Sequence, residues 1–210
     1  MIRVFIADDH PLIREGFKKL IDKEVDITVV GEASDSDRIV QFFRDHDCDV
    51  LVLDINMPGK GGLEVLQDIK RWHPNLKVLI LSIYPEEQFA VRALRAGAVG
   101  YITKESAPEE LVKAIRKVHQ GGRYISETVA EHLAREVNSS RKREPHEALS
   151  PREFQVFHML GQGKTVQEIA HELSLSLSTV NTYRRRILEK TGLKSNAEII
   201  HYAIKNKLVE

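Results

Sequence analysis

The chain has 210 residues, of which 42% are hydrophobic, and this is enough for one large domain or two smaller ones with buried cores. We expect a cytoplasmic protein, because the short apolar runs exclude a membrane span, the early acidic residues are unlike a signal peptide, and one cysteine, Cys48, cannot form an intramolecular disulfide. Residues 1–137 hold 19 Lys and Arg against 23 Asp and Glu, whereas residues 149–210 hold 9 against 6, so an acidic part precedes a basic part that suits a polyanionic partner.

Short apolar segments alternate with longer segments of helical periodicity over the first 120 residues. Five such β-then-α units in a row predict an α/β domain with a five-stranded parallel sheet and helices on both faces, because the crossovers are right-handed. The expected strands are 3–7, 28–33, 50–54, 77–82 and 100–104, and the expected helices are 11–23, 36–46, 61–73, 86–97 and 107–119.

Polar side chains follow four of these strands at the point where each strand ends. Asp8 and Asp9 follow the first strand, and Asp54 ends the third. In an open parallel sheet these ends form one edge, so the three acids need a cation, and an all-oxygen set favours Mg²⁺. Ser82 and Lys104 end the fourth and fifth strands and suit a phosphoryl group. We interpret His10 as a solvated neighbour of this site rather than a ligand.

Residues 1–122 resemble the receiver domain of response regulators, a flavodoxin-like (βα)₅ fold. The motifs that carry the resemblance are DDHP at 8–11, LDINMPGKGG at 53–62, LS at 81–82 and GYITK at 100–104. The resemblance implies that Asp54 accepts a phosphoryl group from a sensor histidine kinase. It also implies that Asp9, Asp54 and the backbone carbonyl of Asn56 bind Mg²⁺, with Asp8 acting through water.

The same resemblance implies a switch at the edge of the sheet. Lys104 would pair with the phosphoryl oxygens and Ser82 would move to hydrogen-bond them. The space that Ser82 leaves would then let Tyr101 turn inward, which shifts the population between two states. The sequence departs from many receivers at Glu105, where a proline is frequent.

The α/β alternation ends near residue 122. Residues 123–137 predict one more short helix, and residues 138–148 are polar and aperiodic, which predicts a flexible linker. Residues 149–210 predict an all-α domain of about four helices. No internal repeat relates this part to the first.

Two capping signals and a short turn indicate a helix-turn-helix in the basic part. Ser150 with Glu153 and Thr165 with Glu168 have capping-box spacing, and LSLS at 173–176 precedes a long helix. On that helix Val180, Ile187 and Thr191 share one face. Asn181, Thr182 and Arg185 lie opposite, and Asn and Arg read adenine and guanine edges. Basic residues expected at phosphates are Arg184, Arg186, Lys190, Lys164 and Lys194.

Residues 149–210 resemble the LuxR-type DNA-binding domain, so the whole chain is similar to response regulators of the NarL/FixJ class. The motifs are LSPREFQVFHMLGQGK at 149–164, EIAHELSLSLSTVNTY at 168–183 and ILEKTGL at 187–193. The sequence departs from the family at 165–167 and at Asn181, where a lysine is frequent. The resemblance implies that helix 196–206 supplies a dimer surface.

We therefore predict a transcriptional regulator, not a turnover enzyme, whose phosphorylation at Asp54 controls dimerisation or release of the DNA-binding domain. Its expected partners are a sensor histidine kinase, promoter DNA, a second copy of the chain and, as a further candidate, RNA polymerase. We expect no membrane binding. Two alternatives remain. One is a regulator that binds DNA irrespective of phosphorylation; the other is an aspartyl phosphatase, which would want an acid at Asn56.

Overall fold

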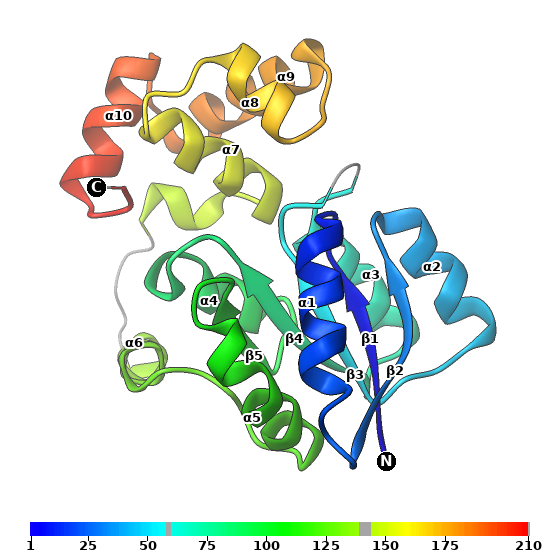
Figure 1. The fold of residues 1–210 in the computed structure, drawn as a ribbon. Helices are drawn as coiled ribbons and strands as arrows, with labels where there is room; N and C mark the ends of the chain where they lie inside the picture. Colours follow the sequence, from blue (N-terminus) through cyan, green and yellow to red (C-terminus); the bar gives the residue numbers. More distant parts are fainter. Residues whose placement is uncertain (58–59, 139–143, 210) are drawn as a thin grey trace. The chain divides into compact units, whose positions relative to one another are not determined.

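The computed structural model describes residues 1–57, 60–138 and 144–209 (Figure 1). The chain divides into two compact units, Met1–Ser139 and Ser140–Glu210, and each is described by itself. Within the described ranges, no helix combines the length and the apolar character that crossing a bilayer requires.

The first unit is built on one parallel sheet with the strand order β2-β1-β3-β4-β5. The predicted five-stranded α/β architecture is confirmed, and each strand begins and ends within one residue of its expected bounds. The strands are β1 (Ile2–Ala7), β2 (Ile27–Ala33), β3 (Val50–Asp54), β4 (Lys77–Ser82) and β5 (Gly100–Thr103). The order reverses at β1 and β3, because β1 leads to β2 on one side while β3 lies on its other side.

Helices cover both faces of the sheet, as crossover connections require. Val4 and Ile6 pack in one apolar core with residues of α1 and α5, whereas Phe5 faces the other side, where its ring centroid lies 4.3 Å from that of Phe42 in α2. The alternation of side chains along β1 therefore fixes which face each helix covers. These helices are α1 (Pro11–Ile21), α2 (Ser36–Asp45), α3 (Gly62–Trp72), α4 (Glu86–Arg95) and α5 (Ala107–His119).

The chain after α5 adds to the open edge of the sheet. Tyr124 donates its backbone N–H to Val99 at 3.0 Å and accepts from the N–H of Tyr101 at 2.9 Å, so it continues the ladder beyond β5. The predicted additional helix follows as α6 (Glu127–Asn138), which contacts α4 and buries Val129 to 1% exposure. The extension is thus packed on the first unit.

Over residues 144–209 the second unit contains the four expected helices and one short 3-10 helix. Its elements are η1 (Pro145–Ala148), α7 (Pro151–Gly161), α8 (Val166–Glu172), α9 (Leu177–Thr191) and α10 (Asn196–Lys205). Residues 139–143 of the expected linker lie outside the described residues. The end of that linker differs from the expectation, because η1 is ordered by its side chains: His146 Nδ1 lies 3.0 Å from the hydroxyl of Tyr202.

Local capping explains where the helices of the second unit begin and end. Both predicted capping boxes are present, at Ser150 with Glu153 and at Thr165 with Glu168. Gly192 ends α9 with a φ of +74°, a left-handed conformation that glycine adopts without steric cost. The starts of α7 and α8 and the end of α9 are therefore each determined by one or two residues.

Gly62 lets the start of α3 approach the end of β3. A methyl group on Gly62 would overlap the backbone carbonyl oxygen of Asp54 and lie 2.8 Å from the Cα of Ile55. Real Cβ atoms do not make such contacts with backbone, which cannot move away as a flexible side chain can. Because Gly62 has no side chain, the start of α3 can pack directly against the backbone of Asp54 and Ile55.

We expect Gly62→Ala to lower the free energy of unfolding of the first unit by about 1–3 kcal/mol or more through overpacking. The matched variant is Gly16→Ala in α1, where an added Cβ has no atom within 4 Å and should stabilise the helix by roughly 0.5–1 kcal/mol. Urea unfolding followed by the fluorescence of Trp72, the one tryptophan of the chain, reports on this unit. Equal effects of the two substitutions would contradict the close approach at Gly62.

Candidate functional site

Asp54 and Asp8 lie side by side at the carboxyl edge of the sheet, where the strand order reverses. Asp54 is the last residue of β3 and Asp8 follows β1, its neighbour in the sheet. Both carboxylates are fully buried, with 0% exposure. Ligands of open parallel sheets bind at this position, because the adjacent loops diverge there.

One ammonium group joins the two buried carboxylates. Lys104 Nζ lies 2.7 Å from an oxygen of Asp8 and 2.7 Å from an oxygen of Asp54. Burial raises the pKa of Asp54 to about 6, although Lys104 opposes this shift. Burial alone would lower the pKa of Lys104, but Asp54 and Asp8 more than offset it, so its pKa is raised. The predicted meeting of three strand ends is present.

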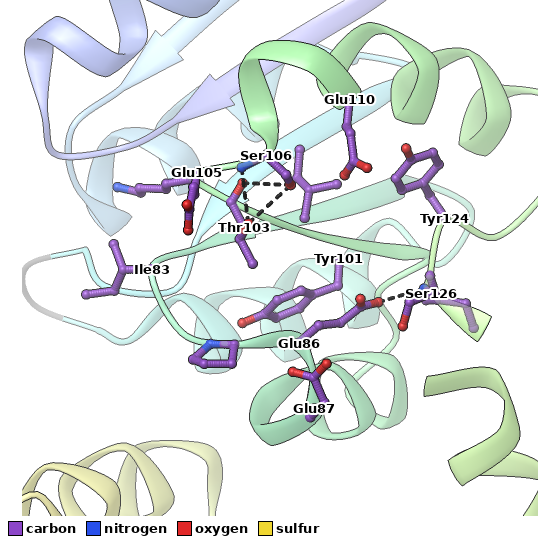
Figure 2. A pocket seen from close by; sticks show the side chains of 14 residues that line it. Ile83, Glu86, Glu87, Tyr101, Thr103, Glu105, Ser106, Glu110, Tyr124 and Ser126 are labelled. Carbon is purple, nitrogen blue, oxygen red and sulfur yellow. Dashed lines mark hydrogen bonds between the residues drawn. The ribbon is translucent and has the colours of Figure 1, made fainter. Parts of the chain in front are cut away.

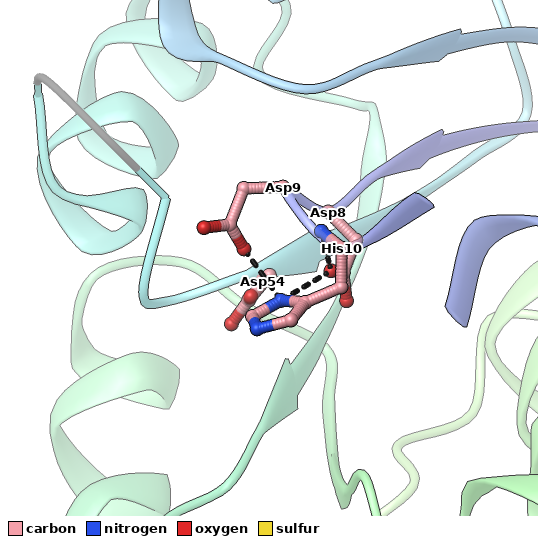
Figure 3. Close-up of side chains that lie close together, drawn as sticks. All are labelled: Asp8, Asp9, His10 and Asp54. Atoms are coloured by element: carbon pink, nitrogen blue, oxygen red, sulfur yellow. Dashed lines mark hydrogen bonds and ion pairs between the residues drawn. The ribbon is translucent and has the colours of Figure 1, made fainter. Parts of the chain in front are cut away.

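Asp9 and His10 complete the cluster (Figure 3). Ligand atoms of Asp8, Asp9, His10 and Asp54 all lie within 4.8 Å of one another. His10 Nδ1 is 2.7 Å from Asp9 Oδ1 and 3.1 Å from Asp8 Oδ1. The imidazole is more than half exposed, as we expected, but its ring nitrogen belongs to the cluster. Its place directly after two acids was the sequence signal.

The oxygen atoms of this cluster suit a hard divalent cation. Asp8 Oδ2 and Asp9 Oδ1 are shielded from solvent and accept no hydrogen bond of good geometry from the described residues, although Lys104 Nζ lies 2.7 Å from the first and His10 Nδ1 lies 2.7 Å from the second. Each carboxylate oxygen has lone pairs beyond the one that faces this nitrogen. These oxygens beside Asp54 therefore suit a hard cation such as Mg²⁺. Asn56, predicted to help, donates its backbone N–H to Asp54 Oδ1 at 2.9 Å.

Ser82 and Tyr101 connect this edge to the side of the sheet. Ser82 is fully buried and accepts the backbone N–H of Tyr84 at 3.0 Å. The Tyr101 hydroxyl donates to the carbonyl of Tyr84 at 2.9 Å, so Ser82 and Tyr101 both bond to the backbone of Tyr84. Tyr101 is only 2% exposed, and burial raises its pKa. It thus already lies inward, whereas we expected it to turn inward after Ser82 moves.

A pocket of about 620 Å³ lies beside Tyr101 (Figure 2). Residues of β5, the start of α4 and the segment 124–126 line it. Glu86 crosses its floor and accepts the backbone N–H of Ser126 at 2.8 Å. This bond joins the first turn of α4 to the residue that precedes α6.

The long helix of the second unit has the two faces that the sequence predicts. Val180 and Ile187 of α9 are fully buried, and Thr191 is half-buried. Asn181 and Arg185 are exposed on the other face, while Thr182 is half-buried and donates its hydroxyl to the carbonyl of Ser178 at 2.9 Å. The exposed face therefore presents an amide and a guanidinium together.

The predicted phosphate contacts fall into two groups. Lys164 pairs with Glu172 at 2.6 Å, Lys190 pairs with Glu153 at 2.6 Å, and Arg184 donates to Asn196 at 2.5 Å. These three side chains hold elements of the second unit together. Arg186 and Lys194 are exposed and carry no such tie among the contacts described for this unit. The sequence could not separate the groups, because their partners lie 8 to 37 residues away.

Two family models match the chain, one to each unit. The response regulator receiver domain matches residues 4–116, and the model for bacterial regulatory proteins of the luxR family matches residues 147–203. The first match includes every residue of the aspartate cluster. The second includes α7, α8 and α9.

Several relatives match this chain over nearly their whole length. The response regulator UvrY of Escherichia coli (strain K12) is 38% identical over 209 residues, which are 99% of this chain and 96% of UvrY. The response regulator GacA of Pseudomonas aeruginosa is 38% identical over 211 residues, which are 100% of this chain and 99% of GacA. RcsB from Salmonella enterica serovar Typhimurium, bound to a promoter with the phosphomimetic BeF₃⁻, superposes with a TM-score of 0.60 at 28% identity, covering 96% of this chain and 97% of RcsB.

The burial of Asp54 predicts that the ionised carboxylate lowers the free energy of unfolding and that this effect depends on pH. Because its pKa rises from 3.8 to about 6 on folding, the folded state loses stability as pH rises through about 6. We expect Asp54→Asn, which removes the charge, to raise the free energy of unfolding by about 1–3 kcal/mol at pH 7.5, at 1.36 kcal/mol for each pH unit. The gain should shrink as pH falls from 7 to 5, measured by Trp72 fluorescence in urea. A gain that does not vary with pH would contradict the elevated pKa.

Proposed function

The chain belongs to the response regulators of the NarL/FixJ class, which regulate transcription in two-component signalling, and on this premise we propose that Asp54 is its phosphoryl acceptor and α9 its DNA-reading helix. The observation that carries the proposal is the buried pair of Asp54 and Asp8 with Lys104 between them. A rigid carboxylate, a fixed ammonium group and a second buried carboxylate at one sheet edge have no structural purpose that apolar residues would not serve better.

The transfer requires a nucleophile and little other covalent chemistry. A carboxylate oxygen of Asp54 attacks the phosphorus of a phosphohistidine on a sensor kinase, the new O–P bond forms, and the P–N bond breaks with its electron pair returning to the imidazole. At neutral pH a group of pKa about 6 is mostly ionised and is ready to attack. β3 and Gly62 hold it in place, so the site acts mainly by positioning.

Charge neutralisation falls to Lys104 and to a bound Mg²⁺. Asp9, Asp54 and the backbone carbonyl of Asn56 would hold the cation, with Asp8 contributing through water, and when bound it supplies positive charge against the phosphoryl oxygens. Lys104 already lies 2.7 Å from Asp54, so its ammonium group reaches a phosphoryl oxygen on the same carboxylate with a small displacement. The solvent-shielded oxygens of Asp8 and Asp9, each 2.7 Å from one nitrogen, support this assignment.

Signal output would begin at Ser82. Its hydroxyl accepts the backbone N–H of Tyr84, and the carbonyl of Tyr84 accepts the Tyr101 hydroxyl, so a phosphoryl group that draws Ser82 away disturbs the residue that holds Tyr101. Since Tyr101 is inward in this structure, the switch acts through the hydrogen bonds of its hydroxyl rather than through entry of its ring. The loss of these hydrogen bonds would shift β5, and β5 would transmit the shift to α4, which it contacts.

The output is DNA binding by the second unit. Asn181 and Arg185 on the exposed face of α9 have the chemistry for base edges, and Arg186 and Lys194 would contact phosphates. Lys164, Lys190 and Arg184 would act mainly by holding the domain together, given their partners. We propose α10 as a surface for a homodimer, sensor kinase and promoter DNA as further partners, and RNA polymerase as a candidate contact at the promoter.

A turnover enzyme is the weaker candidate. Aspartyl phosphatases need an acid two residues after the nucleophile to protonate the leaving group, and this position holds Asn56. Slow self-dephosphorylation by water remains compatible with the proposed role as phosphoryl acceptor.

Asp54→Asn should abolish formation of the acyl phosphate, because an amide is not a nucleophile at neutral pH. The measurement is Phos-tag electrophoresis and intact mass after incubation with Mg²⁺ and a small phosphodonor, with footprinting of promoter DNA on the same samples. Asp45→Asn on the exposed side of α2 is the matched control and should react like the wild type. Undiminished phosphorylation of the Asp54→Asn variant would rule out the assignment, and equal footprints with and without phosphodonor would show binding independent of phosphate.

Substitutions on α9 should separate base reading from phosphate contact. Arg185→Ala should cost about 1–3 kcal/mol at its preferred base and relax specificity there, whereas Arg186→Ala should weaken all sites alike and reduce the salt slope by about 1. Binding to a randomised DNA library at several salt concentrations measures both. Lys113 is an exposed residue of α5 in the first unit, and Lys113→Ala removes one positive charge there. It should change neither the base preference nor the salt slope. An unchanged base preference of Arg185→Ala would remove that residue from the reading face.

A further inference from the structure

We propose that His10 is a ligand of the cation at the phosphoryl-acceptor site and makes this site selective for borderline transition-metal ions such as Co²⁺. The inference rests on the proposed Mg²⁺ site and adds one residue to it. An imidazole in place of one oxygen or water converts an all-oxygen site into a mixed nitrogen and oxygen site, which favours such metals over Mg²⁺.

The spacing of the ligand atoms is the first argument. Adjacent ligands of an octahedral Mg²⁺-sized ion lie roughly 3 Å apart, since each is about 2.1 Å from the metal. His10 Nδ1 lies 2.7 Å from Asp9 Oδ1 and 3.1 Å from Asp8 Oδ1, which brackets that value. His10 Nδ1 and Asp9 Oδ1 can therefore occupy neighbouring positions of one coordination shell without rearrangement, while Asp8 keeps the water-mediated role proposed above.

The direction of the contacts is the second argument. Although His10 Nδ1 is only 2.7 Å from Asp9 Oδ1, that oxygen receives no directed hydrogen bond from the described residues. Ligands of one metal aim at a shared centre rather than at each other, so a close contact that is off the hydrogen-bond axis is the expected arrangement. The same oxygen is shielded from solvent, which leaves a cation as its natural partner.

The position of Lys104 is the third argument. Its Nζ lies 3.4 Å from His10 Nδ1, so this ring nitrogen faces two carboxylates and one ammonium group. Nδ1 needs a proton to bond to the carboxylates and a lone pair to accept from Lys104, and a bound cation would take the place of that proton between Nδ1 and the acids. His10 is placed by α1, which begins at Pro11 directly after it, so the backbone holds the ring at the rim of the site.

The alternative reading is that His10 only hydrogen-bonds to the acids. Its Nδ1 and the carboxylates are compatible with that reading at 3.1 Å to Asp8, so coordination must be measured directly. Isothermal titration calorimetry of the full chain with Co²⁺ and with Mg²⁺ measures both affinities. Proton NMR of the Co²⁺ form detects the hyperfine-shifted ring protons of a directly bound imidazole.

We expect His10→Ala to lower the Co²⁺ association constant by about tenfold or more, the size of effect seen when a metal site loses a supporting group. The Mg²⁺ constant should change by less than about threefold, because Mg²⁺ retains waters readily. His10→Asn keeps a polar side chain and should also lose Co²⁺ affinity and the shifted imidazole signals. His119→Ala is the matched control, since the end of α5 lies at the opposite edge of the sheet.

Each result decides the matter. Loss of Co²⁺ affinity in both His10 variants, with the shifted imidazole signals absent, supports the proposal. Equal loss for both ions, no loss, or a wild-type Co²⁺ spectrum without imidazole signals overturns it while leaving the phosphoryl-acceptor site intact. If neither ion binds the wild type, the cation site itself fails, and the inference fails with it.

Discussion

The sharing of one ammonium group by two buried carboxylates is the interaction on which the first unit depends. Asp54 and Asp8 have no contact with solvent, and Lys104, which follows β5, offsets the negative charge of both carboxylates. Burying two like charges would be prohibitive without it, and adding a phosphoryl group to Asp54 changes the charge at the same point. The site is therefore poised: whatever neutralises the new charge must come from Lys104, from a cation or from a shift of neighbouring hydroxyl groups.

Sequence reasoning reached the fold because the determinants are local. β3 and β4 are apolar over residues 50–53 and 78–81, and the polar residues at the ends of β1, β3 and β5 must meet once the strands are parallel. The same topology brought Asp8, Asp54 and Lys104 to one edge without knowledge of any distance. The starts of helices could also be predicted from the sequence, because a capping box such as that of Ser150 is complete within four residues.

What the sequence could not supply was pairing over a distance. The ion pair of Lys190 with Glu153 spans 37 residues and gives a residue expected at phosphates a structural partner as well. The inward position of Tyr101 depends on the carbonyl of Tyr84, which has no sequence signal. The bridge at Tyr124 was missed because a single residue in a ladder has no periodicity. In each case the tertiary neighbour, rather than local propensity, determines the outcome.

The attachment of Tyr124 to β5 has a mechanical consequence for the whole chain. The segment between α5 and α6 is held at two points, because Tyr124 pairs with β5 and Ser126 bonds to Glu86 in α4. A displacement of β5 therefore acts directly on residues 124–126 and, through them, on α6, which packs against α4. An isolated receiver cut before Tyr124 would leave β5 as a bare edge, and its sheet would be open to pairing with another molecule.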